Sequence, residues 1–168
     1  VYVDCTLGGG GHTALMARKL ESGRIGAIDR DDAALTYAAE RLKDVPPQAE
    51  ISLVRGNFAD LDAILADLGI GEIDGALFDL GVSSRQIDEA ERGFSYMRDA
   101  PLDMRMDRRE KFTARDAVNT WSAEKLAQIF RDYGEERHAK RIAAASCRTR
   151  EDSPIATTGV LAELVADV

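Results

Sequence analysis

The fold of this chain is decided by Val1-Tyr2-Val3-Asp4-Cys5-Thr6-Leu7-Gly8-Gly9-Gly10-Gly11-His12-Thr13-Ala14. The residues before the glycines alternate in the manner of a buried strand. Those after them have the apolar spacing of a helix, with Leu15, Met16 and Leu20 on one side. Glycine lets the backbone turn tightly and approach a ligand, and the helix behind it presents unpaired N–H groups. Strand, glycine turn and helix in this order predict a nucleotide-type binding turn.

Two classes of ligand use such a turn. Gly9, Gly11 and Ala14 fit the G-x-G-x-x-A pattern of dinucleotide-binding folds. S-adenosyl-L-methionine (AdoMet) folds also use a glycine turn, but they hold an adenosine and a charged amino acid. Asp4 favours AdoMet, because a carboxylate repels a pyrophosphate and attracts an ammonium or sulfonium group. A glycine-rich connector without a ligand is the third interpretation, and it is disfavoured because four glycines cost stability.

The composition indicates a soluble globular protein of one domain, or of one domain with a subdomain. The chain has 168 residues, of which 45% are hydrophobic and 31% charged. It contains no apolar run of about 20 residues and no signal peptide, so we expect a cytoplasmic protein without a membrane contact. Cys5 and Cys147 lack metal-ligand spacing, so we expect a reducing compartment, no disulfide and no metal site.

The net charge of −8 argues against a nucleic-acid partner, but the charge is unevenly distributed. Residues 85–168 carry 15 basic and 16 acidic side chains and are therefore nearly neutral. Six basic residues lie close together there: Arg98, Arg105, Arg108, Arg109, Lys111 and Arg115. They indicate either a nucleic-acid contact or an ordinary solvated face of mixed charge.

The first half of the chain alternates between strand and helix patterns. Further strands are predicted at residues 24–29, 50–54 and 73–79, with helical spacing between them. Asp31 or Asp32 should begin the second helix, and Pro46-Pro47 should end that region. This order predicts a parallel sheet with helices on both faces.

Three predicted strands end in an acid, namely Asp4, Asp29 and Asp79. Ligands bind at the carboxyl ends of parallel strands, so these acids outline a site. Asp29 follows Gly9 by about 20 residues, which is the spacing of an acid that accepts hydrogen bonds from a ribose. Phe58, just after the third strand, either borders an adenine ring or is an ordinary core residue.

The pattern changes after Asp79. Polar, glycine- and aromatic-containing loops occupy residues 80–107, and long loops of this kind are often functional. From Thr113 onward the spacing is helical, with Ser122 as a candidate helix cap. We expect a core at residues 1–104 and a helical insert at residues 105–168. Four strands make a thin sheet, and Val1 already lies in a strand, so the chain looks truncated at both ends.

Six separated motifs together resemble the RsmH (MraW) family: D-C-T-L-G-G-G-G-H (4–12), A-I-D-R-D (27–31), D-L-G-V-S-S (79–84), R-G-F-S-Y-M-R (92–98), P-L-D-M-R-M-D (101–107) and Y-G-E-E-R (133–137). The resemblance covers nearly the whole chain. It implies a Rossmann-like class I methyltransferase sheet with an α-helical inserted subdomain for RNA recognition. It also implies methyl transfer from AdoMet to the N4 amino group of a cytidine in the decoding region of bacterial 16S ribosomal RNA. The family's first segment and final strands are lacking here.

The resemblance also assigns the cofactor contacts. It places them on Gly10, Gly11, His12, Asp29, Phe58, Asp79 and Gln86. In that arrangement the glycine turn cradles the amino-acid end of AdoMet, Asp29 takes the ribose hydroxyls and Phe58 borders the adenine. The assignments of His12 and Gln86 rest on the resemblance alone.

The N4 amine of cytosine is a poor nucleophile, because its lone pair is delocalised into the ring. Acceptors for its N–H groups would free that lone pair, and Asp79 with the Leu80 carbonyl is the candidate catalytic group. Phe94 or Tyr96 would stack the base. Cys5 is interpreted as a packing residue, since this chemistry needs no thiol.

The expected partner is 16S ribosomal RNA in the small ribosomal subunit or its precursor, and a homodimer is left open. Two alternatives from other functional classes remain. A nicotinamide-dependent oxidoreductase is compatible with the spacing of Gly9, Gly11, Ala14 and Asp29. A non-catalytic RNA-binding or assembly factor would retain the fold without the reaction.

Overall fold

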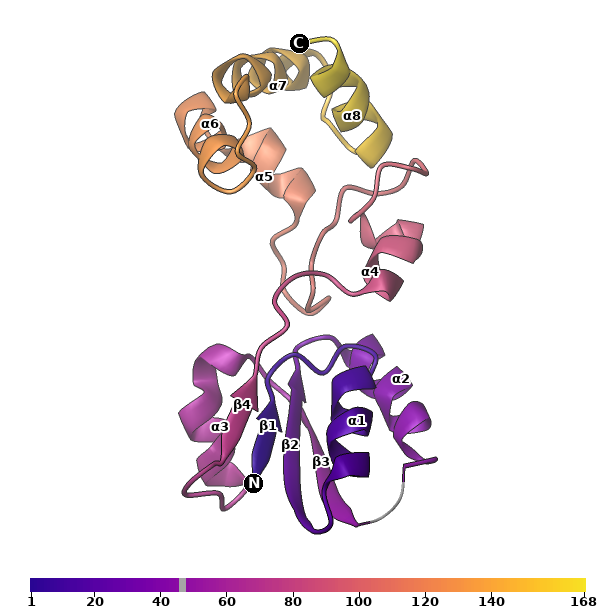
Figure 1. Cartoon of the computed structure of the whole chain (residues 1–168). Coiled ribbons are helices and arrows are strands. Elements are labelled where there is room, and N and C mark those ends of the chain that lie inside the picture. The colour runs from indigo at the N-terminus through magenta and orange to yellow at the C-terminus, as the bar shows by residue number, and fades with distance from the viewer. Residues whose placement is uncertain (46–47) are drawn as a thin grey trace. The chain divides into compact units, whose positions relative to one another are not determined.

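The computed structural model describes residues 1–45 and 48–168, and the chain divides into two compact units, Val1–Ser83 and Ser84–Val168 (Figure 1). Pro46 and Pro47, which were expected to end the second helical region, lie outside the described residues. The division that we expected after residue 104 falls inside the second unit.

The first unit contains a four-stranded parallel sheet in the order β3-β2-β1-β4. Its strands are β1 (Tyr2–Asp4), β2 (Gly23–Asp29), β3 (Ala49–Arg55) and β4 (Gly75–Leu77). Asp4 pairs with Ala27 of β2 and Leu77 of β4, and Asp29 pairs with Arg55 of β3. The carboxyl ends of all four strands therefore meet at one edge of the sheet. The predicted α/β class and parallel sheet are confirmed.

Helices cover both faces of this sheet (Figure 1). They are α1 (Gly11–Lys19), α2 (Asp32–Leu42) and α3 (Leu61–Asp67), with a 3₁₀ turn, η1 (Phe58–Asp60), before α3. Asp31 caps α2 as predicted, because its side chain accepts a hydrogen bond from the Ala33 N–H at 3.0 Å. Apolar residues of α3 pack with Val3 and Ile28, whereas those of α2 pack with Ala27 on the opposite side.

The second unit is built from helices. They are α4 (Ser84–Asp88), a 3₁₀ turn η2 (Ala90–Arg92), α5 (Ala114–Thr120), α6 (Ala123–Asp132), α7 (Ala139–Asp152) and α8 (Thr158–Ala166). Ser122 caps α6 as predicted, and Thr113 caps α5 in a capping box with Asp116. Leu126 of α6 and Ala143 of α7 are buried where these two helices pack together, and Trp121 and Phe130 are partly buried against them. None of the helices in the described part of the chain is long and apolar enough to cross a membrane.

The long loop between η2 and α5 is held by arginine side chains. The buried Arg92 donates from Nη2 to the carbonyls of Arg105 at 3.0 Å and Met106 at 3.1 Å. Arg105 pairs with Asp103 at 2.6 Å and donates to the Glu110 carbonyl at 2.6 Å. The loop is therefore an ordered part of the fold. Two of the basic residues grouped in the sequence, Arg105 and Arg109, are paired with carboxylates of this same loop.

Candidate functional site

The turn after β1 adopts a backbone that favours glycine. Gly8 has φ 50° and Gly10 has φ 73°, both in the left-handed region. A Cβ on Gly10 would lie 3.1 Å from the Cβ of Ala38 on α2, which is a tight approach. The Gly10 N–H donates to the Leu7 carbonyl at 2.8 Å, so the turn is closed. Backbone conformation and helix packing together account for the glycine at position 10.

Asp4 fixes this turn from below. Its carboxylate is fully buried and accepts hydrogen bonds from the Thr6 N–H at 3.1 Å and from the Thr13 hydroxyl at 2.7 Å. From the sequence we expected this carboxylate to lie beside the ammonium or sulfonium group of a ligand. The structure leaves no surface of Asp4 for a ligand to touch, so its charge acts on the turn and on the start of α1.

Asp29 joins the glycine turn to the ends of two further strands. Its Oδ2 accepts from the Gly8 N–H at 2.8 Å, and its Oδ1 accepts from the Asp31 N–H at 2.9 Å. Its carbonyl accepts from the Gly56 N–H at 3.0 Å, just beyond β3. An ionised carboxylate has about four acceptor positions, so each oxygen keeps capacity for another donor. The Asp29 side chain is therefore oriented by the turn and can still accept hydrogen bonds from the hydroxyl groups of a ligand.

Asp79 is tied to the same turn through its backbone. Its N–H donates to the Thr6 hydroxyl oxygen at 2.8 Å, while its side chain is 69% exposed. The imidazole Nδ1 of His12 lies 3.8 Å from the Asp79 carboxylate. The structure thus brings Gly8, Asp29, Asp79 and His12 together at the carboxyl edge of the sheet.

Phe58 lies in the 3₁₀ turn after β3. Its ring meets Phe78 edge-to-face, with centroids 5.6 Å apart and planes at 88°. Phe58 is 39% exposed and Phe78 is 49% exposed. So much exposed ring surface is unusual for a core residue and leaves room for a planar ligand to contact the pair.

Gln86 belongs to α4 in the second unit, where its side chain is buried. Its assignment as a cofactor contact stays a prediction. The same holds for the base-stacking candidates, of which Tyr96 is largely exposed and Phe94 lies near the buried Arg92 guanidinium.

Cys5 is a packing residue, as expected from the sequence. It is buried with Val3 and Ile28 between the sheet and α3. Burial, and then the neighbouring Asp4 carboxylate, raise the pKa of the Cys5 thiol. A thiol held protonated in this way is a poor nucleophile.

Sequence reasoning missed four residues that shape the turn. Thr6 and Thr13 supply the hydroxyls that connect Asp79 and Asp4 to it. Tyr37 and Arg41, one turn apart on α2, lie against its outer side. Arg41 donates to the Gly9 carbonyl at 3.3 Å, and a Cβ on Gly9 would lie 3.5 Å from the Tyr37 ring. The two threonines lie within the quoted motif, whereas nothing in the sequence marks α2 as the neighbour of the turn.

The sheet order, the glycine turn after β1 and the acids at the strand ends define a Rossmann-like α/β fold of the methyltransferase type. The MraW methylase family matches residues 1–168, and the chain belongs to this family.

Relatives with the name "Ribosomal RNA small subunit methyltransferase H" are similar to this chain along nearly its whole length. The protein of Brevibacillus brevis is 52% identical over 168 residues, which are 99% of this chain and 53% of that protein. A Clostridium botulinum protein is 50% identical, covering 98% of this chain and 53% of its own length. A Symbiobacterium thermophilum protein is 50% identical, covering 98% and 51%. The chain spans about half the length of these relatives.

Proposed function

We propose that the protein containing this chain transfers a methyl group from AdoMet to the N4 amino group of a cytidine in the decoding region of 16S ribosomal RNA. The family and the names of the relatives support an AdoMet-dependent ribosomal RNA methyltransferase. The observation that carries the proposal is the Asp29 carboxylate, which is fixed to the glycine turn by the Gly8 N–H and retains acceptor capacity. The resemblance of the motifs supports the choice of the cytidine N4.

The residues at the sheet edge fit AdoMet. Asp29 accepts the ribose hydroxyls, and the rings of Phe58 and Phe78 offer apolar surface to the adenine. Gly10, Gly11 and the side chain of His12 border the amino-acid end, and the resemblance adds Gln86 to the residues proposed to contact the cofactor. When bound, AdoMet supplies an electrophilic methyl group on a sulfonium. The carboxylates of Asp29 and Asp79 attract that positive charge.

Asp79 acts on the acceptor amine. An ionised carboxylate can accept a hydrogen bond from an N–H of the N4 amino group. This hydrogen bond favours a pyramidal nitrogen, whose lone pair is no longer conjugated with the ring. The Leu80 carbonyl offers a second acceptor for the other N–H. The Thr6 hydroxyl holds the Asp79 backbone, so the carboxylate starts from a fixed point and reorganises little. Alignment of the amine with the methyl group supplies much of the rate. As the bond from N4 to the methyl carbon forms, the bond from that carbon to sulfur would break, leaving a neutral thioether, and the Asp79 carboxylate would receive the proton that N4 loses.

The helical residues 105–168 contribute RNA recognition, and the substrate is the small ribosomal subunit or its precursor. This assignment follows the resemblance and the names of the relatives. A nicotinamide-dependent oxidoreductase is the competing function for the same glycine spacing. Titrating the full-length protein with AdoMet and with NADH by calorimetry separates the two, and we expect heat from AdoMet alone. Binding of NADH without AdoMet binding would refute the proposal.

The sharpest test of the reaction is Asp79→Asn in the full-length protein. The substitution keeps the size of the side chain and one acceptor but removes the charge. We expect methylation of 16S RNA per folded molecule to fall about 10²–10³-fold, as when one preorganised electrostatic group is removed. The melting temperature without ligand should barely move, because the side chain is exposed. Asp67→Asn, an exposed acid at the end of α3, is the matched control. Near-normal turnover by Asp79→Asn would remove Asp79 from the mechanism.

A further inference from the structure

Residues 137–150 form a strongly basic segment in an acidic chain. They contain five Lys or Arg residues and no Asp or Glu, whereas the whole chain has a net charge of −8. The segment runs from the turn before α7 through most of that helix. Such a local run of one sign indicates either a structural use or an anionic partner.

One of the five cations has a structural use. Arg150 donates from Nη1 to the carbonyls of Val118 at 2.8 Å and Trp121 at 2.7 Å, which fastens α7 to the end of α5. The other four, Arg137, Lys140, Arg141 and Arg148, are exposed. Within residues 1–45 and 48–168 no carboxylate pairs with any of these four.

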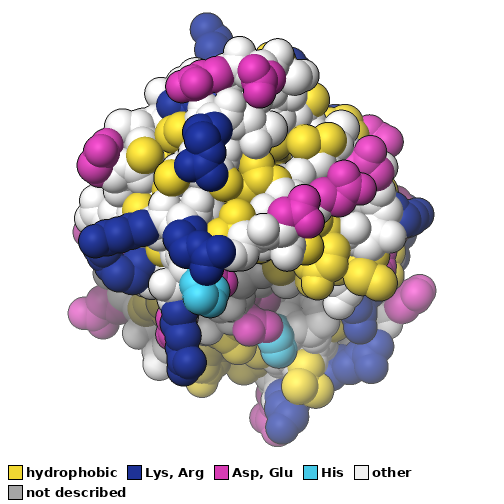
Figure 2. Space-filling view, turned by 90° about the horizontal axis from the view of Figure 1, so that it is seen from above, with side chains coloured by type: hydrophobic (Ala, Val, Ile, Leu, Met, Phe, Trp, Pro, Cys, Tyr) yellow, Lys and Arg dark blue, Asp and Glu magenta, His cyan; other side chains and the backbone are white. Residues whose placement is uncertain are grey.

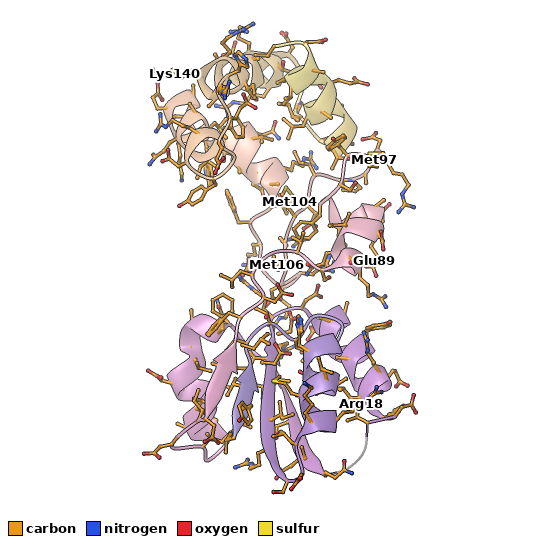
Figure 3. The ribbon with its side chains drawn as sticks, viewed as in Figure 1. Arg18, Glu89, Met97, Met104, Met106 and Lys140 are labelled. Carbon is orange, nitrogen blue, oxygen red and sulfur yellow. The ribbon has the colours of Figure 1, made fainter. Side chains whose placement is uncertain are left out.

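The exposed cations follow from the way α7 packs. The helix buries Ile142, Ala143 and Ser146 against its neighbours, so its other side carries the charges. Arg141 and Arg148 are seven residues apart, which places them on one face about 10 Å from each other. Figure 2 shows Lys and Arg side chains at the surface seen from above, with Asp and Glu side chains elsewhere on the same face. Figure 3 labels Lys140 near the start of α7, beside α6.

Tyr133 lies at the end of α6 in the turn that leads to this segment, and it is 82% exposed. The turn is ordered, because the Glu135 N–H donates to the Arg131 carbonyl at 3.1 Å and the Glu136 N–H to the Phe130 carbonyl at 3.0 Å. An exposed aromatic ring that precedes a run of exposed cations by a few residues in the chain matches the chemistry of single-stranded nucleic acids.

The acidic residues of the turn leave this surface positive. Asp132 pairs with Arg131 at 2.9 Å, and the Glu136 carboxylate accepts the His138 N–H at 2.6 Å. Glu135 and Glu136 are the two acids of this turn that pair with no cation in the described part of the chain, against the four exposed cations.

We propose that Tyr133, Arg137, Lys140, Arg141 and Arg148, here called the α7 basic face, bind RNA. The cations contact backbone phosphates, and the Tyr133 ring stacks on an unpaired base. The choice of RNA as the polyanion rests on the proposed function. The residues themselves are selected by their exposure, their charge and their lack of carboxylate partners.

The test compares two double variants of the full-length protein. Lys140→Gln/Arg141→Gln removes two adjacent cations from the α7 basic face. Arg18→Gln/Lys19→Gln removes two adjacent, exposed cations from α1, where Figure 3 labels Arg18, and neither of them pairs with a carboxylate of the described residues. Binding of a 16S RNA fragment is measured by fluorescence anisotropy at several salt concentrations. We expect the α7 variant to bind about 10-fold more weakly and with a salt slope smaller by about 1.5, and the α1 variant to match the wild type.

A second pair of variants isolates stacking from charge. Tyr133→Phe keeps the ring, whereas Tyr133→Leu replaces it with an aliphatic side chain. We expect Tyr133→Leu to weaken RNA binding roughly 5-fold or more with an unchanged salt slope, and Tyr133→Phe to bind nearly as the wild type does.

Control measurements separate this proposal from the catalytic one. AdoMet affinity and methyl transfer at saturating RNA should be unchanged in the α7 variant. A wild-type protein that binds RNA through this face but transfers no methyl group would refute the reaction and leave the RNA surface standing. Equal losses in the two double variants, or no loss in an α7 variant of unchanged melting temperature, would overturn the surface. So would a defect confined to binding of anionic lipid vesicles.

Discussion

The two units satisfy their backbone hydrogen bonds in different ways. In Val1–Ser83 the strands pair with one another, and β2 and β3 match along seven residues. In Ser84–Val168 the described residues form helices and a single isolated bridge, Pro101 to Thr157. The long loop of that unit pairs with no strand among the described residues. Arginine side chains donate hydrogen bonds to several of its backbone carbonyls instead.

This difference accounts for part of the arginine content of the second half of the sequence. A guanidinium carries five N–H donors in a fixed plane and can donate hydrogen bonds to several carbonyls at once. Arg92, Arg105 and Arg150 are used in this way. A count of basic residues therefore mixes structural arginines with those available to a partner. Only the contacts separate the two groups.

The largest expected effect is on the second unit, from Arg92→Met. The substitution keeps an apolar stem but leaves the carbonyls of Arg105 and Met106 without donors in a buried place. We expect a loss of about 3 kcal/mol in the free energy of unfolding, measured by urea denaturation. Hydrogen exchange should accelerate in residues 93–113. Arg108→Met, at an exposed arginine nearby, is the control, and equal losses in both variants would contradict the structural use of Arg92.

Asp29→Ala tests a place where the first unit also relies on a side chain to hold its backbone. Loss of an acceptor for ribose hydroxyls should weaken AdoMet binding by about 1.5–3 kcal/mol, or about 10- to 150-fold. The unit should remain folded. The structure adds a loss of about 1 kcal/mol in stability, because the N–H groups of Gly8 and Asp31 lose their acceptor. Calorimetry measures the first effect and thermal unfolding the second. An unchanged dissociation constant would remove the ribose role.

Asp103 contributes to the pH dependence of the second unit. The Arg105 side chain donates to its carboxylate and lowers the pKa of Asp103 below its ordinary value of 3.8. A folded pKa below the unfolded one contributes stability above pH 3.8, and that stability is lost as the pH falls through the folded pKa. We expect the stability difference between wild type and Asp103→Asn to shrink as the pH is lowered from about 5 to about 3. A difference that does not vary with pH would contradict this.

The smallest expected effect is a gain, from Glu135→Gly in the turn after α6. Glu135 has φ 52°, which a side chain disfavours and glycine adopts freely. We expect the variant to be more stable by about 0.5–1 kcal/mol in thermal unfolding. Glu135→Ala keeps a Cβ and should show no such gain, so equal stabilisation by both would assign the effect to the lost charge.

The fold of the first unit was largely predictable, because each element carries a local signal. The alternation of apolar residues indicated the strands, and Asp31 marked the start of α2. In the second unit Ser122 marked the start of α6 in the same way. At the candidate site the sequence placed Asp29 correctly at the end of β2, whereas β4 ends at Leu77, two residues before Asp79. The expectation that Asp4 lies beside a ligand was wrong, because its side chain is fully buried. Burial depends on how the turn folds back over the strand, and not on the position of the residue along the strand.

The sequence by itself determined the α/β class, the glycine turn, the family motifs and the basic run at residues 137–150, because these depend on residue type and spacing. The tertiary structure alone decided which charged side chains have hydrogen-bond or ion-pair partners within the chain. It buries Asp4 under Thr6 and Thr13, leaves Asp79 exposed, uses Arg92 to close a loop and leaves Lys140 unpaired. The physical reason is that hydrogen bonds and ion pairs act over a few ångströms in space, and their partners here lie up to tens of residues away in the chain.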